Sequence, residues 1–62
     1  MTRELIDIAC MVIAETDKAY RIDDGVTKAW LPKSQVEWHP ETGKGAGTMV
    51  VPEYLAKDKG LI

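Results

Sequence analysis

Short apolar runs separated by polar and glycine-rich turns make up this chain, a pattern that favours β-strands over long helices. Residues 5–14 form the longest apolar run, which is rich in β-branched side chains and has no wide polar stripe. The run predicts a strand that is buried on both faces towards its end. A helix remains an open alternative, because periodicity alone does not separate strand from helix in a short apolar run. Residues 48–51 predict a second, shorter strand.

The clearest local signal is a β-hairpin over residues 18–31, where two apolar-rich runs flank an Asp-Asp-Gly sequence. A two-residue turn at positions 24–25 would place Arg21 directly opposite Lys28, a mildly repulsive pair. Alternate side chains would then sort to opposite faces of the hairpin. The mostly apolar face is expected to hold Tyr20, Ile22, Thr27, Ala29 and Leu31, and the other face Ala19, Arg21, Lys28 and Trp30.

The segment after the hairpin fits two structures. Pro32 cannot donate to a strand ladder, so pairing should stop there or continue only at an edge. Ser34 and Glu37 have the spacing of a capping box, which predicts a single helical turn. The alternative is a short strand over residues 35–39, with its valine and tryptophan on one face. Residues 41–47 follow as a glycine-rich surface loop.

A short helix is predicted near the C-terminal end, over residues 52–59. Pro52 suits the first helical position, and the negative charge of Glu53 suits the helix amino end. Gly60 is expected to end the helix in a left-handed conformation, so that the next residue folds back. A helix this short is unstable alone and must dock on the sheet. The expected docking side chains are Tyr54, Leu55, Leu61 and Ile62.

These elements predict a mainly β (α+β) fold: a small partly open barrel or bent antiparallel meander with one short C-terminal helix. Its 62 residues make one domain, residues 1–62. A chain of this size buries only about 60% of its unfolded surface, so a partner chain would add stability. The single cysteine, Cys10, lies in an apolar run and is expected to be a buried structural thiol.

Charge is distributed unevenly around a net value of −2. Residues 18–33 hold four cations and two anions, whereas the segments on either side are negative. This is little positive charge for a dedicated nucleic-acid binder. We recognise no signal peptide and no apolar run near the ~20 residues of a membrane span. The expected setting is therefore the cytoplasm, without membrane binding, which also suits a lone cysteine.

Side chains with catalytic chemistry are sparse. Ser34, His39 and Cys10 are the single serine, histidine and cysteine, and no nucleophile elbow surrounds the first two. A zinc site would need several more ligands. The glycine-rich residues 43–48 lack the spacing of a phosphate-binding loop. We therefore expect no enzymatic activity, no metal and no cofactor.

A candidate binding surface lies on the polar face of the predicted hairpin, where Arg21, Lys28 and Trp30 would gather. Basic surfaces with aromatic side chains stack bases and follow phosphates. The alternative is that Trp30 packs under the terminal helix while the cations are merely solvated. The full set of candidate binding residues is Arg21, Lys28, Trp30, Lys33, Trp38 and His39.

The most specific sequence block is Trp-Leu-Pro-Lys-Ser-Gln at residues 30–35, supported by residues 15–19, the Asp-Asp-Gly turn and residues 51–56. Over residues 12–62 these blocks resemble a group of short proteins, without an established activity, that are encoded in tailed-phage and prophage genomes. The resemblance implies a setting in the cytoplasm of a bacterial host. It implies no catalytic residue.

Two functions agree with these features. The first is a non-enzymatic phage or prophage accessory protein, inhibitory in one form, that binds a host or phage protein. Such a chain can also bind its own copy, and an open strand edge at residues 5–14 or 48–51 would be the natural seam of a homodimer. The second is a small barrel that binds single-stranded nucleic acid through the hairpin cations and Trp30, with an affinity that falls as salt rises.

Overall fold

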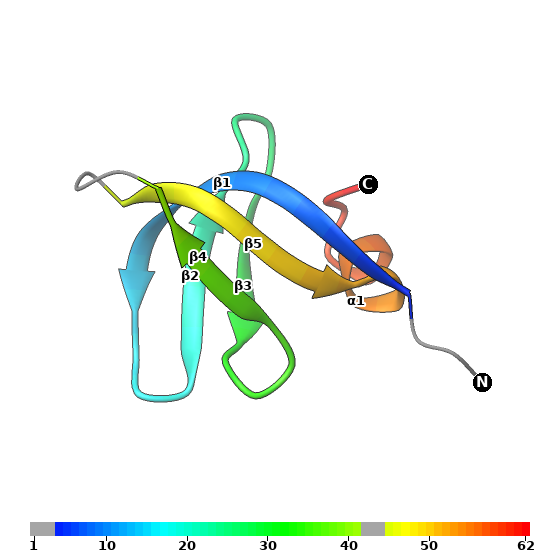
Figure 1. Cartoon of the computed structure of the whole chain (residues 1–62), viewed down its shortest axis with the longest axis horizontal. Coiled ribbons are helices and arrows are strands. Elements are labelled where there is room, and N and C mark those ends of the chain that lie inside the picture. Colours follow the sequence, from blue (N-terminus) through cyan, green and yellow to red (C-terminus); the bar gives the residue numbers. More distant parts are fainter. Residues whose placement is uncertain (1–3, 42–44) are drawn as a thin grey trace.

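The computed structural model describes residues 4–41 and 45–62, and it is mainly β with one short C-terminal helix (Figure 1). Its elements are β1 (Leu5–Glu15), β2 (Ala19–Asp23), β3 (Lys28–Pro32), β4 (Glu37–Pro40), β5 (Ala46–Pro52) and α1 (Glu53–Asp58). All pairings are antiparallel, in the order β3-β2-β1-β5-β4. Because β3 and β4 do not pair, the bent sheet stays open. The predicted fold class is confirmed.

β1 is the central strand and joins the two halves of the sheet. Residues 5–11 pair with β5, and residues 11–15 pair with β2. Between Val12 and Ala14 the register shifts, so Ile13 is an extra residue on β1, a β-bulge. Bulges bend a strand and increase its twist. The bulge therefore lets β1 turn away from β5 and continue beside the β2–β3 hairpin (Figure 1).

Only one face of β1 is buried, so the strand prediction is confirmed but the expected burial on both faces is wrong. Ile8 and Cys10 are 7% exposed, whereas Met11 is 45% and Ile13 is 44% exposed. The reason is that α1 and the other strands bury their apolar side chains on one side of the sheet, the inner side. In the described part of the chain, no element covers the opposite, outer side.

The β2–β3 hairpin forms where the sequence predicts it, but its register is different. Arg21 pairs with Trp30 instead of Lys28, and the loop comprises four residues, 24–27. A two-residue type I′ turn needs a positive φ at both central residues, and in this loop only Gly25 has one, at +99°. The register differs by two residues, which keeps every strand side chain on its predicted face because the side-chain period is two.

Two aspartates, Asp23 at the end of β2 and Asp24 in the loop, explain the length of the loop. The Asp24 carboxylate accepts hydrogen bonds from the N–H groups of Val26 (2.9 Å) and Thr27 (2.7 Å). The Asp23 carboxylate accepts one from the N–H of Gly25 at 2.8 Å. The Asp24 N–H donates to the Thr27 carbonyl at 3.1 Å, and Thr27 lies in the loop before β3 begins at Lys28.

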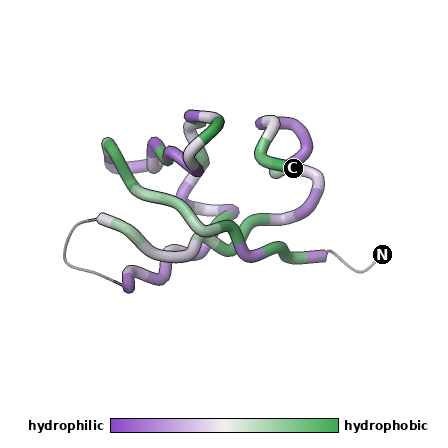
Figure 2. Tube along the Cα trace, turned by 90° about the horizontal axis from the view of Figure 1, so that it is seen from above, coloured by the Kyte–Doolittle hydropathy of each residue, from purple (hydrophilic) through white to green (hydrophobic). Residues whose placement is uncertain are grey.

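The core fills the inner side of the sheet. Hydrophobic stretches follow the strands, whereas the connecting loops are mostly hydrophilic (Figure 2). The buried side chains are Ile8, Cys10, Ile22, Ala29, Leu31, Met49, Val51, Leu55, Ala56 and Leu61. Cys10 is a free, buried thiol as predicted, and burial raises its pKa.

The segment between β3 and β4 contains features of both predicted alternatives. Pro32 ends β3 as predicted, and its carbonyl accepts a hydrogen bond from the Gln35 N–H at 3.1 Å, which closes a turn. β4 follows, shifted towards the C-terminus relative to the predicted residues 35–39. Val36 and Trp38 both pack partly buried against the core, as the strand alternative predicts.

β5 is longer than the predicted residues 48–51, because Ala46 and Gly47 pair with β1 instead of lying in a surface loop. Of the predicted loop 41–47, residues 42–44 lie outside the described residues. Gly47 is required where β4 and β5 meet. A Cβ atom at this position would lie only 2.3 Å from the His39 carbonyl oxygen.

α1 follows directly on the end of β5 and packs against β5 and β1 (Figure 1). It is shorter than the predicted residues 52–59, because Pro52 is its N-cap and Lys59 its C-cap. Gly60 has a φ of +73°, and the next N–H, that of Leu61, donates to the Ala56 carbonyl at 2.8 Å. This geometry confirms the predicted Schellman ending.

Two of the four expected docking side chains of α1 are misassigned. Leu55 and Leu61 are buried in the core as predicted, at 7% and 9% exposure. Tyr54 and Ile62 are 51% and 59% exposed, so neither docks in the core; the Tyr54 hydroxyl instead donates a hydrogen bond to the Gln35 side chain in the turn between β3 and β4. The Schellman ending turns only Leu61 back towards the core, and Ala56 takes the inward position on the helix.

The outermost strands of the sheet are β3 and β4, whereas the expected dimer seams lie on the inner strands β1 and β5. Residues 48–50 of β5 are paired on both sides, with β1 and β4, so this part of the expected seam is closed. Residues 5–10 of β1 pair with β5 alone and residues 12–15 with β2 alone, so a homodimer seam on β1 stays a prediction. The true edge strands both end in proline, Pro32 and Pro40. Proline has no N–H to donate, and prolines at edges limit edge-to-edge pairing.

Candidate binding site

Arg21, Lys28 and Trp30 share the outer face of the β2–β3 hairpin, as the sequence predicts. Side chains alternate between the two faces of a strand, so these three lie on the other face from Ile22 and Leu31, which are fully buried on the inner face. Trp30 is 42% exposed, so the alternative in which it packs under the terminal helix is wrong.

In the observed register, each cation of this face lies across from a side chain that interacts favourably with a positive charge. Arg21 lies directly across from Trp30, and its Cζ atom is 5.9 Å from the centroid of the Trp30 ring. This distance allows a cation–π interaction. Lys28 lies across from Asp23. Arg21 and Lys28 are therefore not a directly opposed pair, and the charges of this face are partly compensated.

β1 extends the apolar part of this face, which the sequence analysis missed. Met11 pairs with Asp23 and Ala14 pairs with Arg21, so both lie on the outer side of the sheet. The bulge residue Ile13 lies between them and is exposed. The period-two alternation of β1 would have revealed Met11 and Ile13 if only one face had been taken as buried, but not Ala14, which the bulge moves to the outer side. We define the outer patch as Met11, Ile13, Ala14, Arg21 and Trp30.

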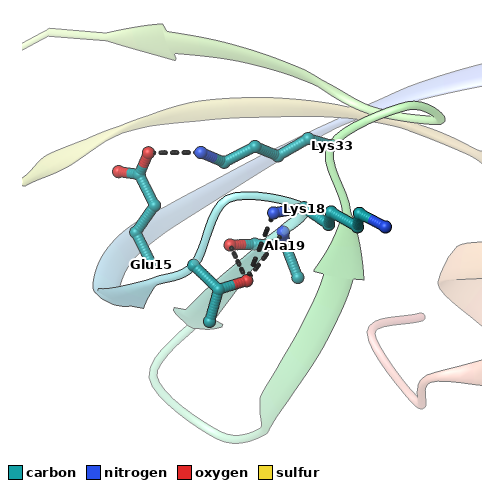
Figure 3. A network of polar contacts seen from close by, with 5 residues as sticks. Glu15, Lys18, Ala19 and Lys33 are labelled. Atoms are coloured by element: carbon teal, nitrogen blue, oxygen red, sulfur yellow. Dashed lines mark hydrogen bonds and ion pairs between the residues drawn. The ribbon is translucent and has the colours of Figure 1, made fainter.

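Lys33 lies away from the outer patch, at the turn between β3 and β4. Its Nζ atom is 2.5 Å from the Glu15 Oε2 atom and 4.9 Å from the centroid of the Tyr20 ring (Figure 3). The hydrogen bond that the Lys33 ammonium donates to the Glu15 carboxylate raises the pKa of Lys33. In the adjacent β1–β2 turn, the Thr16 Oγ1 atom accepts a hydrogen bond from the Ala19 N–H at 3.1 Å (Figure 3). Through its contacts with Glu15 and Tyr20, Lys33 helps to connect the ends of the strands.

The other two candidate residues lie on β4. Trp38 packs partly buried against the core, and its ring centroid is 6.5 Å from that of Tyr20. His39 is on the outer side of β4, where its Nε2 atom is 3.1 Å from the Glu37 Oε1 atom. Neither residue belongs to the outer patch. Among residues 4–41 and 45–62, no group of three or more His, Cys, Asp or Glu side chains is placed to hold a metal ion.

A shallow, open hollow borders the outer patch at Met11. The carboxyl-bearing residues around it are Asp23, Asp24 and Glu41. Hydrogen bonds from the N–H groups of Thr27 and Val26 lower the pKa of Asp24, which keeps this carboxylate charged. The acidic hollow makes the surroundings of the patch less favourable for a polyanion.

In comparisons with known proteins, no family model, no curated protein and no solved structure matches this chain. Within the described residues, no helix has both the length and the apolar character needed to cross a membrane.

Proposed function

We propose that this protein is a non-enzymatic interaction module that binds another protein through the outer patch. The observation that carries the proposal is Trp30, which is 42% exposed and lies beside the Arg21 guanidinium. Tryptophan and arginine are enriched among the residues that dominate protein–protein binding energy. Exposed Met11 and Ile13 on the neighbouring strand add apolar area that a partner would cover.

The resemblance to short phage and prophage proteins supplies the proposed setting. We propose that the chain acts in the cytoplasm of an infected bacterium, as an accessory protein that binds a host or phage protein. Inhibition of that partner is one outcome of such binding. Binding without catalysis agrees with the sparse chemistry of the chain, in which serine, histidine and cysteine each occur once.

Single-stranded nucleic acid is the second candidate partner, because Arg21, Lys28 and Trp30 do share one exposed face. Three features count against it. The Arg21 guanidinium already lies against the Trp30 ring, Lys28 is opposite Asp23, and the chain has a net charge of −2. A titration of Trp fluorescence with oligothymidylate at low salt tests this candidate. Quenching that disappears in an R21A/K28A double variant would favour it.

Selection from a displayed library of random linear peptides tests the protein-binding proposal. We expect enriched peptides to bind the wild-type chain and to lose at least about tenfold in affinity with Trp30→Ala, because truncation of an aromatic anchor removes most of its binding energy. Tyr54→Ala is the matched control, since Tyr54 is also an exposed aromatic but lies on α1. Peptides that bind Trp30→Ala as well as the wild type would contradict the proposed site.

A further inference from the structure

We propose that the partner binds as an extended peptide segment that adds a strand to the free edge of β3. This inference rests on the proposed function and specifies its binding mode. In such strand addition, main-chain hydrogen bonds supply affinity and alternate side chains supply specificity. β3 is suited to it because its edge residues Lys28 and Trp30 also carry the exposed side chains of the outer face.

The register of the hairpin shows which main-chain groups point out of the sheet. The Asp24 N–H donates to the Thr27 carbonyl, and the Lys33 N–H donates to the Lys18 carbonyl, so both pairs are hydrogen-bonded. Hydrogen-bonded and non-hydrogen-bonded pairs alternate along an antiparallel ladder. The Arg21–Trp30 pair and the Asp23–Lys28 pair are therefore non-hydrogen-bonded pairs. The N–H and C=O groups of Lys28 and Trp30 consequently point away from β2.

No helix and no strand other than β2 lies beside β3 in the described chain. Within the described chain, no Cα atom of α1 or β4 lies within 8 Å of a Cα atom of β3. A paired strand would lie at about 4.8 Å. The edge is bounded at both ends: the Thr27 hydroxyl donates to the Gly60 carbonyl at 3.4 Å, and the Pro32 carbonyl is bonded to the Gln35 N–H. Lys28 and Trp30 thus form a short docking edge.

The side chains on the outer face define the chemistry of the segment. An added strand places alternate residues on this face, next to Lys28 and next to Trp30. A carboxylate suits the position beside Lys28, since the face holds the cations Arg21 and Lys28 against the single anion Asp23. An apolar side chain suits the position beside Trp30. The segment is therefore expected to carry an acidic and an apolar residue two positions apart.

The peptides selected from the displayed library provide the probe, and Lys28 provides a main-chain test. Lys28→Pro removes the outward N–H at the first residue of the strand, where proline is tolerated. Lys28→Ala is the matched control, because it removes the same charge but keeps the N–H. We expect Lys28→Pro to bind the selected peptides about tenfold more weakly than Lys28→Ala. Equal affinities in two variants that fold would overturn the strand-addition mode.

Amide hydrogen exchange in the wild-type protein gives a second test that needs no variant. The Lys28 and Trp30 amides should exchange rapidly in the free protein and become protected when peptide binds. The Ala29 and Leu31 amides point towards β2 and should be protected in both states. Bound peptide without new protection at Lys28 and Trp30 overturns the binding mode, while the loss of affinity in Trp30→Ala still supports the proposed function.

If no peptide in the library is enriched over the matrix, both the proposed function and the strand-addition mode are overturned. Enriched peptides that bind Trp30→Ala and the wild type equally, yet protect the two edge amides, would overturn the outer patch and keep the edge. When peptides are enriched, the combination of results therefore assigns a failure to one of the two proposals.

Discussion

At the scale of single residues, the composition of the candidate site depends on the two-residue side-chain period of a strand more than on the length of the turn. Arg21 and Trp30 were predicted on one face, and they share it even though the loop is two residues longer than expected. Their pairing could not be predicted, because it depends on the hydrogen bonds that the Asp24 carboxylate accepts inside the loop. The Arg21 guanidinium lies near the Trp30 ring because the two residues are directly paired across the strands, and not only because they share a face.

The Asp24 carboxylate should make folding depend on pH. Hydrogen bonds from the Thr27 and Val26 N–H groups lower its pKa below the ordinary value of 3.8. A lowered pKa gives stability that is present above the ordinary value and is lost as pH falls through the folded value. We expect an NMR titration to place the Asp24 pKa below 3.8. Asp24→Asn should abolish this contribution, and a titration at or above 3.8 would contradict the loop geometry.

Gly47→Ala should destabilise the protein by about 1–3 kcal/mol, because an added Cβ meets backbone that has no room to move. The nearest atoms are the His39 carbonyl oxygen at 2.3 Å and the Pro40 Cα at 2.8 Å. Urea denaturation measures the loss. Gly25→Ala is the comparison, since it meets no atom within 4 Å and should cost about 1 kcal/mol through its positive φ alone. Equal losses in the two variants would count against the close approach of β4 and β5.

At the scale of elements, the sequence predicts β1, the hairpin and the terminal helix, but not how each is covered. The ending of α1 was predictable because glycine readily adopts the positive φ that turns the chain back at the end of a helix, as Gly60 does. The exposure of β1 was not, since an apolar run is equally compatible with one or two buried faces. Met11 and Ile13 became candidate binding residues only when the structure showed an uncovered outer side.

The corrected docking of α1 can be tested with neighbouring residues. Leu61→Ala should lower the free energy of unfolding by about 2–4 kcal/mol, because Leu61 is buried in the core. Ile62→Ala should change it by less than about 0.5 kcal/mol, because Ile62 is exposed. Thermal denaturation compares the two variants. A larger loss for Ile62→Ala would reverse the assignment of the docking side chain.

At the scale of the whole molecule, the open sheet separates a structural side from a binding side. The inner side holds the core and α1, whereas the outer side carries the outer patch and ends at the β3 edge. The partly open barrel was predictable from short strands and turns. Which strands form the edges was not, because it depends on β1 pairing with both β2 and β5 after it bends at Ile13. That bend places β1 at the centre of the sheet, with residues 5–10 paired to β5 and residues 12–15 paired to β2.

The most direct measurement is an NMR titration of the isotope-labelled wild-type chain with a peptide selected from the random library. The account predicts chemical-shift changes concentrated at Met11, Ile13, Arg21, Lys28 and Trp30, on one side of the sheet. It predicts unchanged resonances for His39 on β4 and Tyr54 on α1. Shift changes centred on β4 or α1, with the Trp30 resonances unmoved, would contradict it.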